Sequence, residues 1–204
     1  MPESLVDISS RIGVNGDSAL KTGRFYAIYD GYFAEFRDKP IRMLEMGVHT
    51  GTSLKVWASY FTRGTIIGLD LERKADFSGY PNIVFEQGDQ TDIARLRTIA
   101  HGGLDIVLDD CSHIGKNAMT SYTALFPYLN SGGLYVIEDW GTGYLKDWPD
   151  GKLPESARPV IAGNRILSHD FGMAGFVKSL VDEAAGDSIS FAHFYKQTVI
   201  LRKA

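Results

Sequence analysis

The sequence predicts an α/β protein with a doubly wound, seven-stranded, mostly parallel sheet and an antiparallel last strand. Short apolar runs alternate with stretches of helical periodicity over most of the chain, which is typical of parallel strands joined by crossover helices. Near the end, two alternating runs are separated only by Lys196 and Gln197, which predicts a hairpin and therefore an antiparallel final strand. A length of 204 residues without internal repeats favours a single domain, residues 1–204.

Five apolar runs are the predicted parallel strands. Each is apolar through most of its length, as expected for strands that helices cover on both faces. Most of them end in Asp, Glu or Gly, at the edge of the sheet where such folds bind ligands. The five runs are residues 41–47, 65–71, 83–89, 104–110 and 133–139, and the two hairpin strands are residues 188–195 and 198–203.

The stretches between the strands predict the helices, because their apolar residues recur at helical spacing. Thr91 is the expected N-cap of a helix that ends near residue 100. A later helix is expected to carry one apolar stripe that begins at Met119 and Tyr122. The predicted helices are residues 22–36, 53–61, 91–100, 116–129 and 168–185.

Two segments lie outside this alternating pattern. Residues 1–37 are predicted to be an N-terminal helical segment, rich in Tyr and Phe toward its end. Residues 140–167 contain Pro149, Pro154, Pro159 and several glycines, which predicts an irregular insertion after the fifth strand. Its position next to the predicted ligand edge makes it a candidate substrate lid.

Composition excludes several classes of protein. With 21 Lys and Arg against 25 Asp and Glu, the net charge of -4 argues against a nucleic-acid partner. Cys111 is the one cysteine, so no disulfide framework or multi-cysteine zinc site is expected. No apolar run approaches the about 20 residues that cross a bilayer, and the first residues lack the pattern of a signal peptide. We expect a cytoplasmic protein without a membrane partner.

The first predicted strand ends in a glycine turn that favours a cationic ligand. Gly47 and Gly51 allow a tight turn and a close approach of the backbone to a ligand. Glu45, just before them, would repel a pyrophosphate but suits an ammonium or sulfonium group. The turn, which continues to Ser53, also lacks the Gly-Lys-Ser/Thr sequence of a nucleoside-triphosphate loop.

The ends of the next two strands favour an adenosyl group. Asp70 follows the glycine turn by roughly 20 residues, where a carboxylate accepts hydrogen bonds from both ribose hydroxyls. Asp89 and Gln90 follow the third strand and offer hydrogen bonds to the edge of an adenine ring. Together the three strand ends predict an adenosyl ligand across the carboxyl edge of the sheet.

Acidic residues also gather at the ends of the fourth and fifth strands. Because these strands are neighbours in a doubly wound sheet, Asp110 is expected beside Glu138 and Asp139. Carboxylates so close repel one another unless a cation or a proton holds them, and hard oxygen ligands suit Mg²⁺. Side chains alternate along a strand, so Glu138 and Asp139 both serve as ligands only if the strand ends there, and Asp109 is expected to face the cofactor.

His113 is the candidate catalytic residue. It follows Asp110 by three residues, on the loop that leaves the fourth strand. A histidine at this position is able to take the proton of a substrate hydroxyl beside a metal ion. The other four histidines have no comparable setting.

Several stretches together resemble the class I S-adenosylmethionine-dependent methyltransferases. More narrowly, they are similar to the metal-dependent sugar O-methyltransferases of macrolide biosynthesis and the related cephalosporin-hydroxylase-like family. Two departures stand out, Cys111 where that family usually has Gly and no His before the aromatic helix. The stretches are FYAIYDGYF, LEMGVHTGTSLKVW, GLDL, FEQGDQTD, DIVLDDCSH and LFPYLNSGGLYVIEDW.

The resemblance implies a Rossmann-like methyltransferase fold and a role for each candidate residue. His113 would be the general base, Asp70 would bind the ribose, and S-adenosylmethionine and Mg²⁺ would be the cofactors. The glycine turn would line the methionine part of the cofactor through Glu45, Gly47, Gly51 and Ser53, the adenine side would meet Asp89 and Gln90, and the metal ligands would be Asp110, Glu138 and Asp139.

The sequence therefore favours a Mg²⁺-assisted O-methyltransferase that acts on a hydroxyl of a small molecule, a sugar or a glycosylated natural product. Three alternatives stay open: an NAD-type oxidoreductase, an Fe-dependent hydroxylase on the same sheet, and a non-catalytic adenosyl-binding protein. The identity of the acceptor and the oligomeric state, including a homo-oligomer, are left open by the sequence.

Overall fold

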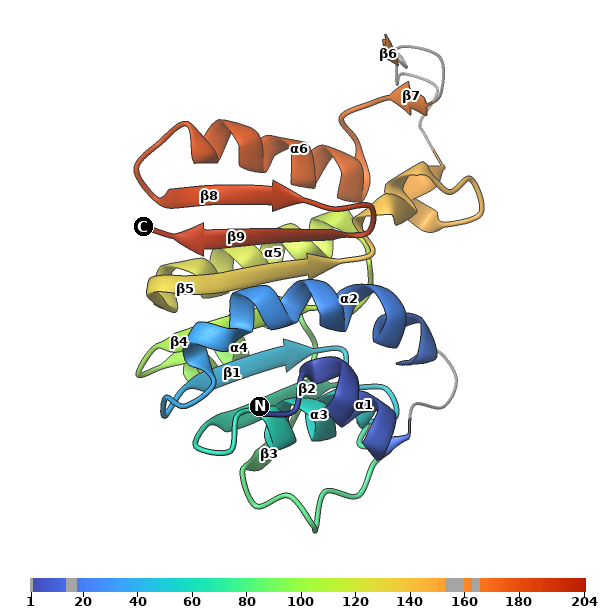
Figure 1. Cartoon of the computed structure of the whole chain (residues 1–204). Coiled ribbons are helices and arrows are strands. Elements are labelled where there is room, and N and C mark those ends of the chain that lie inside the picture. The colour runs from blue at the N-terminus through green and yellow to red at the C-terminus, as the bar shows by residue number, and fades with distance from the viewer. Residues whose placement is uncertain (1, 14–17, 153–159, 163–165) are drawn as a thin grey trace. The chain divides into compact units, whose positions relative to one another are not determined.

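A computed structural model describes residues 2–13, 18–152, 160–162 and 166–204 (Figure 1). Seven strands form one sheet in the order β3-β2-β1-β4-β5-β9-β8, and β6 and β7 form a separate pair. The predicted doubly wound α/β class and its antiparallel last strand are confirmed. The chain divides into two compact units, residues 1–89 and 90–204, and the single-domain organisation stays a prediction.

The first unit contains three parallel strands, and their boundaries agree with the predicted ones within two residues. β2 pairs with both of its neighbours in parallel register. β3 is the outermost strand, and its Val84 is 42 % exposed, so the expectation that every strand is covered on both faces is wrong here. The elements are α1 (Leu5–Ile12), α2 (Ser18–Phe33), the 3-10 helix η1 (Ala34–Phe36), β1 (Arg42–Met46), α3 (Thr52–Tyr60), β2 (Thr65–Asp70) and β3 (Ile83–Gln87).

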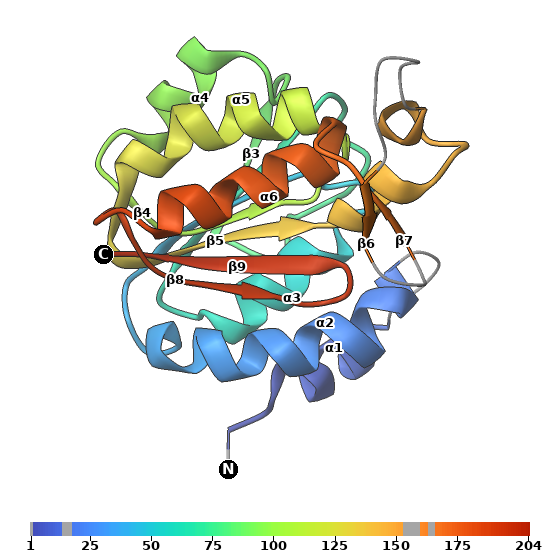
Figure 2. The same ribbon diagram turned by 90° about the horizontal axis from the view of Figure 1, so that it is seen from above.

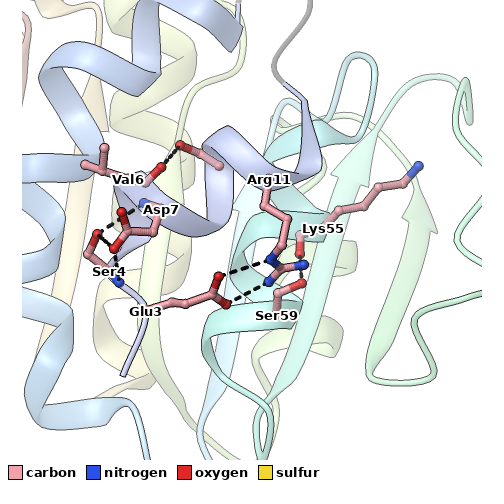
Figure 3. Close-up of polar contacts among 8 residues, drawn as sticks. Glu3, Ser4, Val6, Asp7, Arg11, Lys55 and Ser59 are labelled. Atoms are coloured by element: carbon pink, nitrogen blue, oxygen red, sulfur yellow. Dashed lines mark hydrogen bonds and ion pairs between the residues drawn. The ribbon is translucent and has the colours of Figure 1, made fainter. Parts of the chain in front are cut away.

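The start of α1 is fixed by a capping box (Figure 3). Ser4 Oγ accepts a hydrogen bond from the backbone N–H of Asp7 at 3.1 Å, and the Asp7 carboxylate accepts one from the backbone N–H of Ser4 at 3.0 Å. Both of these N–H groups would otherwise lack a partner at the helix terminus. An exposed ion pair between Arg11 and Glu3, 3.0 Å long, adds little to stability.

Aromatic side chains form the core of the first unit. Tyr26, Tyr29 and Phe33 recur at three- and four-residue spacing along α2 and meet Trp57 of α3, with ring centroids 5.2, 6.1 and 5.6 Å apart. Trp57 is completely buried. Edge-to-face and tilted ring contacts of this kind add to the stabilisation from burial of apolar area, and they hold α3 and the loop before it in place.

The second unit contains two parallel strands followed by an antiparallel pair. β4 pairs with β5 in parallel, whereas β9 pairs antiparallel with both β5 and β8. Helices α5 and α6 lie side by side (Figure 2). The elements are α4 (Ile93–Ala100), β4 (Leu104–Asp109), α5 (Gly115–Leu125), η2 (Phe126–Tyr128), β5 (Leu129–Glu138), η3 (Trp140–Tyr144), η4 (Pro149–Gly151), β6 (Val160–Ala162), β7 (Ile166–Ser168), α6 (Gly172–Ala184), β8 (Ile189–Phe194) and β9 (Thr198–Lys203).

Three boundaries in this unit differ from the predicted ones for local reasons. The N-cap of α4 is Asp92, whose carboxylate accepts a hydrogen bond from the Arg95 N–H at 3.0 Å, and not Thr91. α5 gives way to η2 at Phe126, next to Pro127, which lacks the N–H that a helix needs. β5 begins at Leu129, four residues before its predicted start. Leu129 pairs with Leu104 across a register shift in the ladder with β4, which extends the strand beyond its apolar run.

The helix predicted at residues 116–129 is present as α5, but its apolar stripe is narrower than expected. Tyr122 is buried, whereas Met119 is 49 % exposed, so Met119 does not belong to the core. The helix predicted from residue 168 begins at Gly172 because residues 166–168 form β7.

The segment predicted as an irregular insertion, residues 140–167, contains the short 3-10 helices η3 and η4 and the strands β6 and β7. Residues 153–159 and 163–165 of it lie outside the described part of the chain. Among the helices that the structure describes, none has the length and apolar character of a membrane span.

Candidate active site

The loop between β1 and α3 is built on left-handed backbone conformations. Gly47, His49 and Gly51 have φ values of 89°, 47° and 74°, and such values are unfavourable for most residues other than glycine. A Cβ atom at Gly51 would lie 2.6 Å from that of Ala75, so this position requires glycine for space as well. The predicted glycine turn is therefore present, and it leads directly into α3.

Asp70, at the end of β2, holds this loop. Its Oδ2 accepts hydrogen bonds from the backbone N–H groups of Val48 at 2.8 Å and His49 at 2.9 Å. Partial burial tends to raise the pKa of the Asp70 carboxyl, but the hydrogen bonds from His49, Val48 and other backbone N–H groups outweigh burial and lower the pKa. Asp70 thus shapes the glycine turn, and its predicted contact with a ribose stays a prediction.

Replacing Asp70 with alanine is expected to lower the free energy of unfolding by about 2 kcal/mol at pH 7, because its charge-assisted hydrogen bonds are lost, those from Val48 and His49 among them. Since the pKa of Asp70 is lowered in the fold, its contribution is present above the unfolded pKa of about 3.9 and is lost as the pH falls through the folded pKa. Urea unfolding at pH 7 and at pH 3 measures both effects, without any cofactor. A difference between the two proteins that is as large at pH 3 as at pH 7 would contradict this assignment.

Glu45 and Ser53 meet beneath the same loop. Glu45 is completely buried on β1, and its Oε2 accepts a hydrogen bond from the Ser53 hydroxyl of α3 at 2.8 Å. Asp89, which follows β3, is exposed. The structure thus brings Glu45 and Ser53 together and places Asp89 at the surface.

In the second unit, Gln90 and Asp109 belong to one buried hydrogen-bond network. Gln90 Nε2 donates to Asp109 Oδ1 at 3.3 Å, and Ser121 of α5 donates from its hydroxyl to Asp109 Oδ2 at 2.7 Å. Gln90 Oε1 in turn accepts the backbone N–H of Ser112 at 3.0 Å. Burial raises the pKa of Asp109 to about 6.

This network anchors the loop that leaves β4, since Ser112 lies inside it. Gln90 and Asp109 are 4 % and 2 % exposed, so in this structure they support the loop, and their predicted cofactor contacts stay predictions. Sequence reasoning missed Ser121, although a serine on the buried side of α5 was a signal for a buried polar partner.

The residues after β4 and β5 form a compact group of titratable side chains. One ligand atom from each of Asp110, His113 and Asp139 lies within 4.8 Å of the others. His113 Nε2 is 3.7 Å from Asp139 Oδ2 and 4.0 Å from Asp110 Oδ1. All three side chains are half-buried. The predicted general base therefore faces two of the three predicted metal ligands.

Backbone conformation explains how Asp139 reaches this group. β5 ends at Glu138, and Asp139 has a left-handed φ of 52°, so the alternation of side chains along the strand stops there. His113 has a similar φ of 51°. The strand has to end before Asp139 if this side chain is to point toward the metal site, and β5 does end there.

Glu138 lies at the last position of β5, where it is completely buried and pairs with Thr198 of β9. It is not one of the three grouped residues, and its predicted role as a metal ligand stays a prediction. Cys111 is half-buried and is absent from the residues of positive φ in the described part of the chain, so cysteine fits this position without backbone strain.

The donor set fits a divalent cation. Two carboxylates each bring an oxygen within 4.8 Å of the other and of an imidazole nitrogen, and oxygen ligands of this kind suit Mg²⁺. Nε2 of His113 is the nitrogen nearest the two carboxylates, and Nδ1 is buried without a hydrogen-bond partner among the described residues. The arrangement is able to hold a metal ion and to accept a proton at adjacent positions.

Comparison with known proteins found no matching family model. Among curated proteins, the chain is 41% identical over 203 residues to 8-demethyl-8-(2-methoxy-alpha-L-rhamnosyl)-tetracenomycin-C 3'-O-methyltransferase from Streptomyces olivaceus, with 88% of this chain and 49% of that protein covered. It is 45% identical over 163 residues to mycinamicin VI 2''-O-methyltransferase from Micromonospora griseorubida, with 76% and 38% covered. The chain thus spans half or less of the length of these relatives.

Solved structures agree with the curated relatives. The chain is similar to the MycE methyltransferase from the mycinamycin biosynthetic pathway in complex with Mg and SAH, with a TM-score of 0.78 and 34% identity over 100% of this chain and 55% of that one. A further MycE structure, with a TM-score of 0.78 and 34% identity over 99% of this chain and 55% of that one, also contains mycinamycin VI.

Proposed function

Because this chain is a homologue of the sugar O-methyltransferases of natural-product biosynthesis and has the class I methyltransferase fold, we propose that it catalyses S-adenosylmethionine-dependent O-methylation of a sugar hydroxyl. The observation that carries the proposal is the group formed by Asp110, His113 and Asp139 at the ends of neighbouring strands. A histidine is the most frequent general base for deprotonation of a hydroxyl, and the two carboxylates beside His113 supply oxygen ligands for a metal ion.

Mg²⁺ and S-adenosylmethionine are the proposed cofactors. Asp110 and Asp139 would hold the metal, with Glu138 as the third ligand that the sequence predicts. When bound, S-adenosylmethionine supplies the methyl group and Mg²⁺ lowers the pKa of the acceptor hydroxyl. The chain's relatives include a methyltransferase whose structure contains both Mg and SAH, which supports this pair of cofactors.

His113 takes the proton of the acceptor hydroxyl at Nε2. Asp110 Oδ1 and Asp139 Oδ2 lie 4.0 and 3.7 Å from this nitrogen, so Nε2 is directed toward the position where the acceptor hydroxyl would bind beside the two carboxylates. The deprotonated oxygen is then the nucleophile for methyl transfer. Because donor and acceptor are both bound, the chain's main contribution beyond proton transfer is to orient them.

The glycine turn and Glu45 are the proposed neighbours of the methionine part of the cofactor. Glu45 is buried and carries its carboxylate next to Ser53, which suits a ligand with a positive charge. Asp70 holds the turn in its left-handed conformation and so prepares it for binding.

The acceptor is proposed to be a small glycosylated molecule, as in the tetracenomycin and mycinamicin relatives. We propose a cytoplasmic location, which the single cysteine supports. The comparisons favour this reading over an NAD-type oxidoreductase, an Fe-dependent hydroxylase or a non-catalytic adenosyl-binding protein.

The test is methyl transfer from radiolabelled S-adenosylmethionine to a panel of glycosylated acceptors with vicinal hydroxyls. We expect transfer in Mg²⁺, its loss in EDTA and its return when Mg²⁺ is added in excess. Isothermal titration with S-adenosylmethionine and with NAD accompanies the assay. Binding of NAD without binding of S-adenosylmethionine, or transfer that EDTA leaves unchanged, would overturn the proposal.

A further inference from the structure

The carboxylate of Asp150 joins the beginnings of two helices. Its Oδ2 accepts the backbone N–H of Gly115, the first residue of α5, at 2.5 Å and that of Met173, in the first turn of α6, at 2.6 Å. The first N–H groups of a helix lack partners within it, and a negative charge there is favourable. One side chain from η4 therefore caps two helices that begin next to the candidate site.

Close backbone packing surrounds this carboxylate. A Cβ atom at Gly115 would collide with the backbone of Gly172, and one at Gly172 would lie 2.5 Å from Asp150 Cγ. Gly172 also has a positive φ of 55°. The two helix starts and the side chain of Asp150 thus fit together only because glycine occupies both positions.

Two residues of the 140–152 segment, which contains Asp150, hold the backbone of His113. The His113 carbonyl accepts a hydrogen bond from Trp148 Nε1 at 3.0 Å and one from the Thr142 hydroxyl at 3.2 Å. The rings of Trp148 and His113 lie 6.0 Å apart, tilted by 44°. The single hydroxyl hydrogen of Thr142 is shared with the Asp139 carbonyl, whose oxygen lies 2.8 Å from Thr142 Oγ1, so Thr142 contacts the backbone of two of the three grouped residues.

These contacts stabilise backbone conformations that are unfavourable by themselves. His113 and Asp139 are both held in the left-handed region, which is strained for residues other than glycine and persists only where the surroundings determine it. The loop after β4 is anchored from one side by Gln90 through the N–H of Ser112. Trp148 and Thr142 provide the anchor on the other side of His113.

We propose that Asp150, Trp148 and Thr142 form a clamp that positions His113 for proton transfer, with Asp150 fixing the clamp against α5 and α6. The proposal rests on the proposed function for its effect on catalysis. In this proposal Asp150, Trp148 and Thr142 are positioning residues. The described start of the insertion, residues 140–152, is then a fixed support of the site.

The kinetic test compares variants of the clamp with a matched control. Asp150→Ala is expected to lower kcat by about 10- to 100-fold with little change in KM, because a misplacement of a catalytic group by about 1 Å has effects of this size. Asp150→Asn keeps an acceptor oxygen for both N–H groups and is expected to restore most of kcat. Trp148→Phe keeps an aromatic ring, loses the donor to His113 and is expected to lower kcat several-fold.

Tyr122→Phe is the control. Tyr122 of α5 donates a hydrogen bond from its hydroxyl to Glu183 of α6 at 2.7 Å, so it links the same two helices away from their beginnings. Its loss is expected to lower the thermal midpoint and to leave kcat unchanged. If Asp150→Ala and Trp148→Phe keep the wild-type kcat, or if Tyr122→Phe lowers kcat as much as they do, the clamp is not a positioning element.

A second readout needs neither metal nor cofactor. In NMR spectra of the free chain, the amide protons of Gly115 and Met173 are expected to exchange slowly, and Asp150→Ala is expected to accelerate both while Tyr122→Phe does not. The ring signals of His113 are expected to broaden or split in Asp150→Ala and Trp148→Phe. Unchanged amide exchange and His113 signals would overturn the clamp even if the chain is an active methyltransferase, whereas the changes would support it even if the chain lacks that activity.

Discussion

Replacing His113 with alanine is expected to lower kcat for methyl transfer by about 10²–10⁴-fold, the range that general-base catalysis contributes. The physical reason is that Nε2 of His113 is the proton acceptor that faces the Asp110 and Asp139 carboxylates. Binding of S-adenosylmethionine is expected to persist, because none of the residues proposed to bind it is changed. Initial rates at saturating acceptor and titration of the cofactor measure the two properties separately.

His101→Ala is the matched control. His101 is an exposed histidine that follows α4 in the same unit, and its loss is expected to leave kcat within about two-fold of the wild type, as for surface substitutions away from a site. Wild-type activity in His113→Ala would remove His113 from the mechanism. Loss of activity in both variants would point to a general effect on the fold.

Removing the carboxylate of Asp110 is expected to lower the affinity for Mg²⁺ by more than about 100-fold, since even the outer partners of metal ligands are worth 10- to 100-fold. Asp110 and Asp139 bring two oxygen donors to one position, and a single carboxylate leaves the ion mostly hydrated. Isothermal titration of Asp110→Ala with Mg²⁺, without cofactor or acceptor, measures the loss directly.

Asp105→Asn is the control for this titration. Asp105 lies near the start of β4, at the end opposite the candidate site, and its Oδ1 accepts a hydrogen bond from Asn130 Nδ2 at 2.8 Å. Its Mg²⁺ affinity is expected to equal that of the wild type. Glu138→Gln completes the series and is expected to weaken binding comparably to Asp110→Ala if the predicted third ligand is correct. An unchanged affinity in Asp110→Ala would refute the metal site.

The elements that were predictable from the sequence are those with a local signal. The hairpin of β8 and β9 has two alternating runs and a short connection. β2, β4 and β5 end at acidic residues, and β1 ends directly before a glycine. Thr91 and Asp92 are both good N-caps, and a sequence does not decide between adjacent candidates. The carboxylate that folds back on the Arg95 N–H is that of Asp92.

The candidate site was predictable only in part, because its support comes from distant positions. Asp110, His113 and Asp139 follow from the order of neighbouring strands, which fixes where their backbones lie. Asp150 is 35 residues from Gly115 and 23 from Met173, and no pattern in the residues around it indicates either partner. Gln90 and Asp109 are polar residues at the ends of predicted strands, which favours contacts with a ligand. In the structure their side chains instead form hydrogen bonds with the buried Ser121.

The left-handed backbone at His113 and Asp139 restricts which amino acids these two positions tolerate. Besides glycine, the residues that enter this region most readily are asparagine, aspartate and histidine. Branched aliphatic side chains are excluded on steric grounds before any question of reactivity arises. A change of the chemistry of this site by substitution at these two positions is therefore restricted to about four residue types, unless the neighbouring backbone is rebuilt as well.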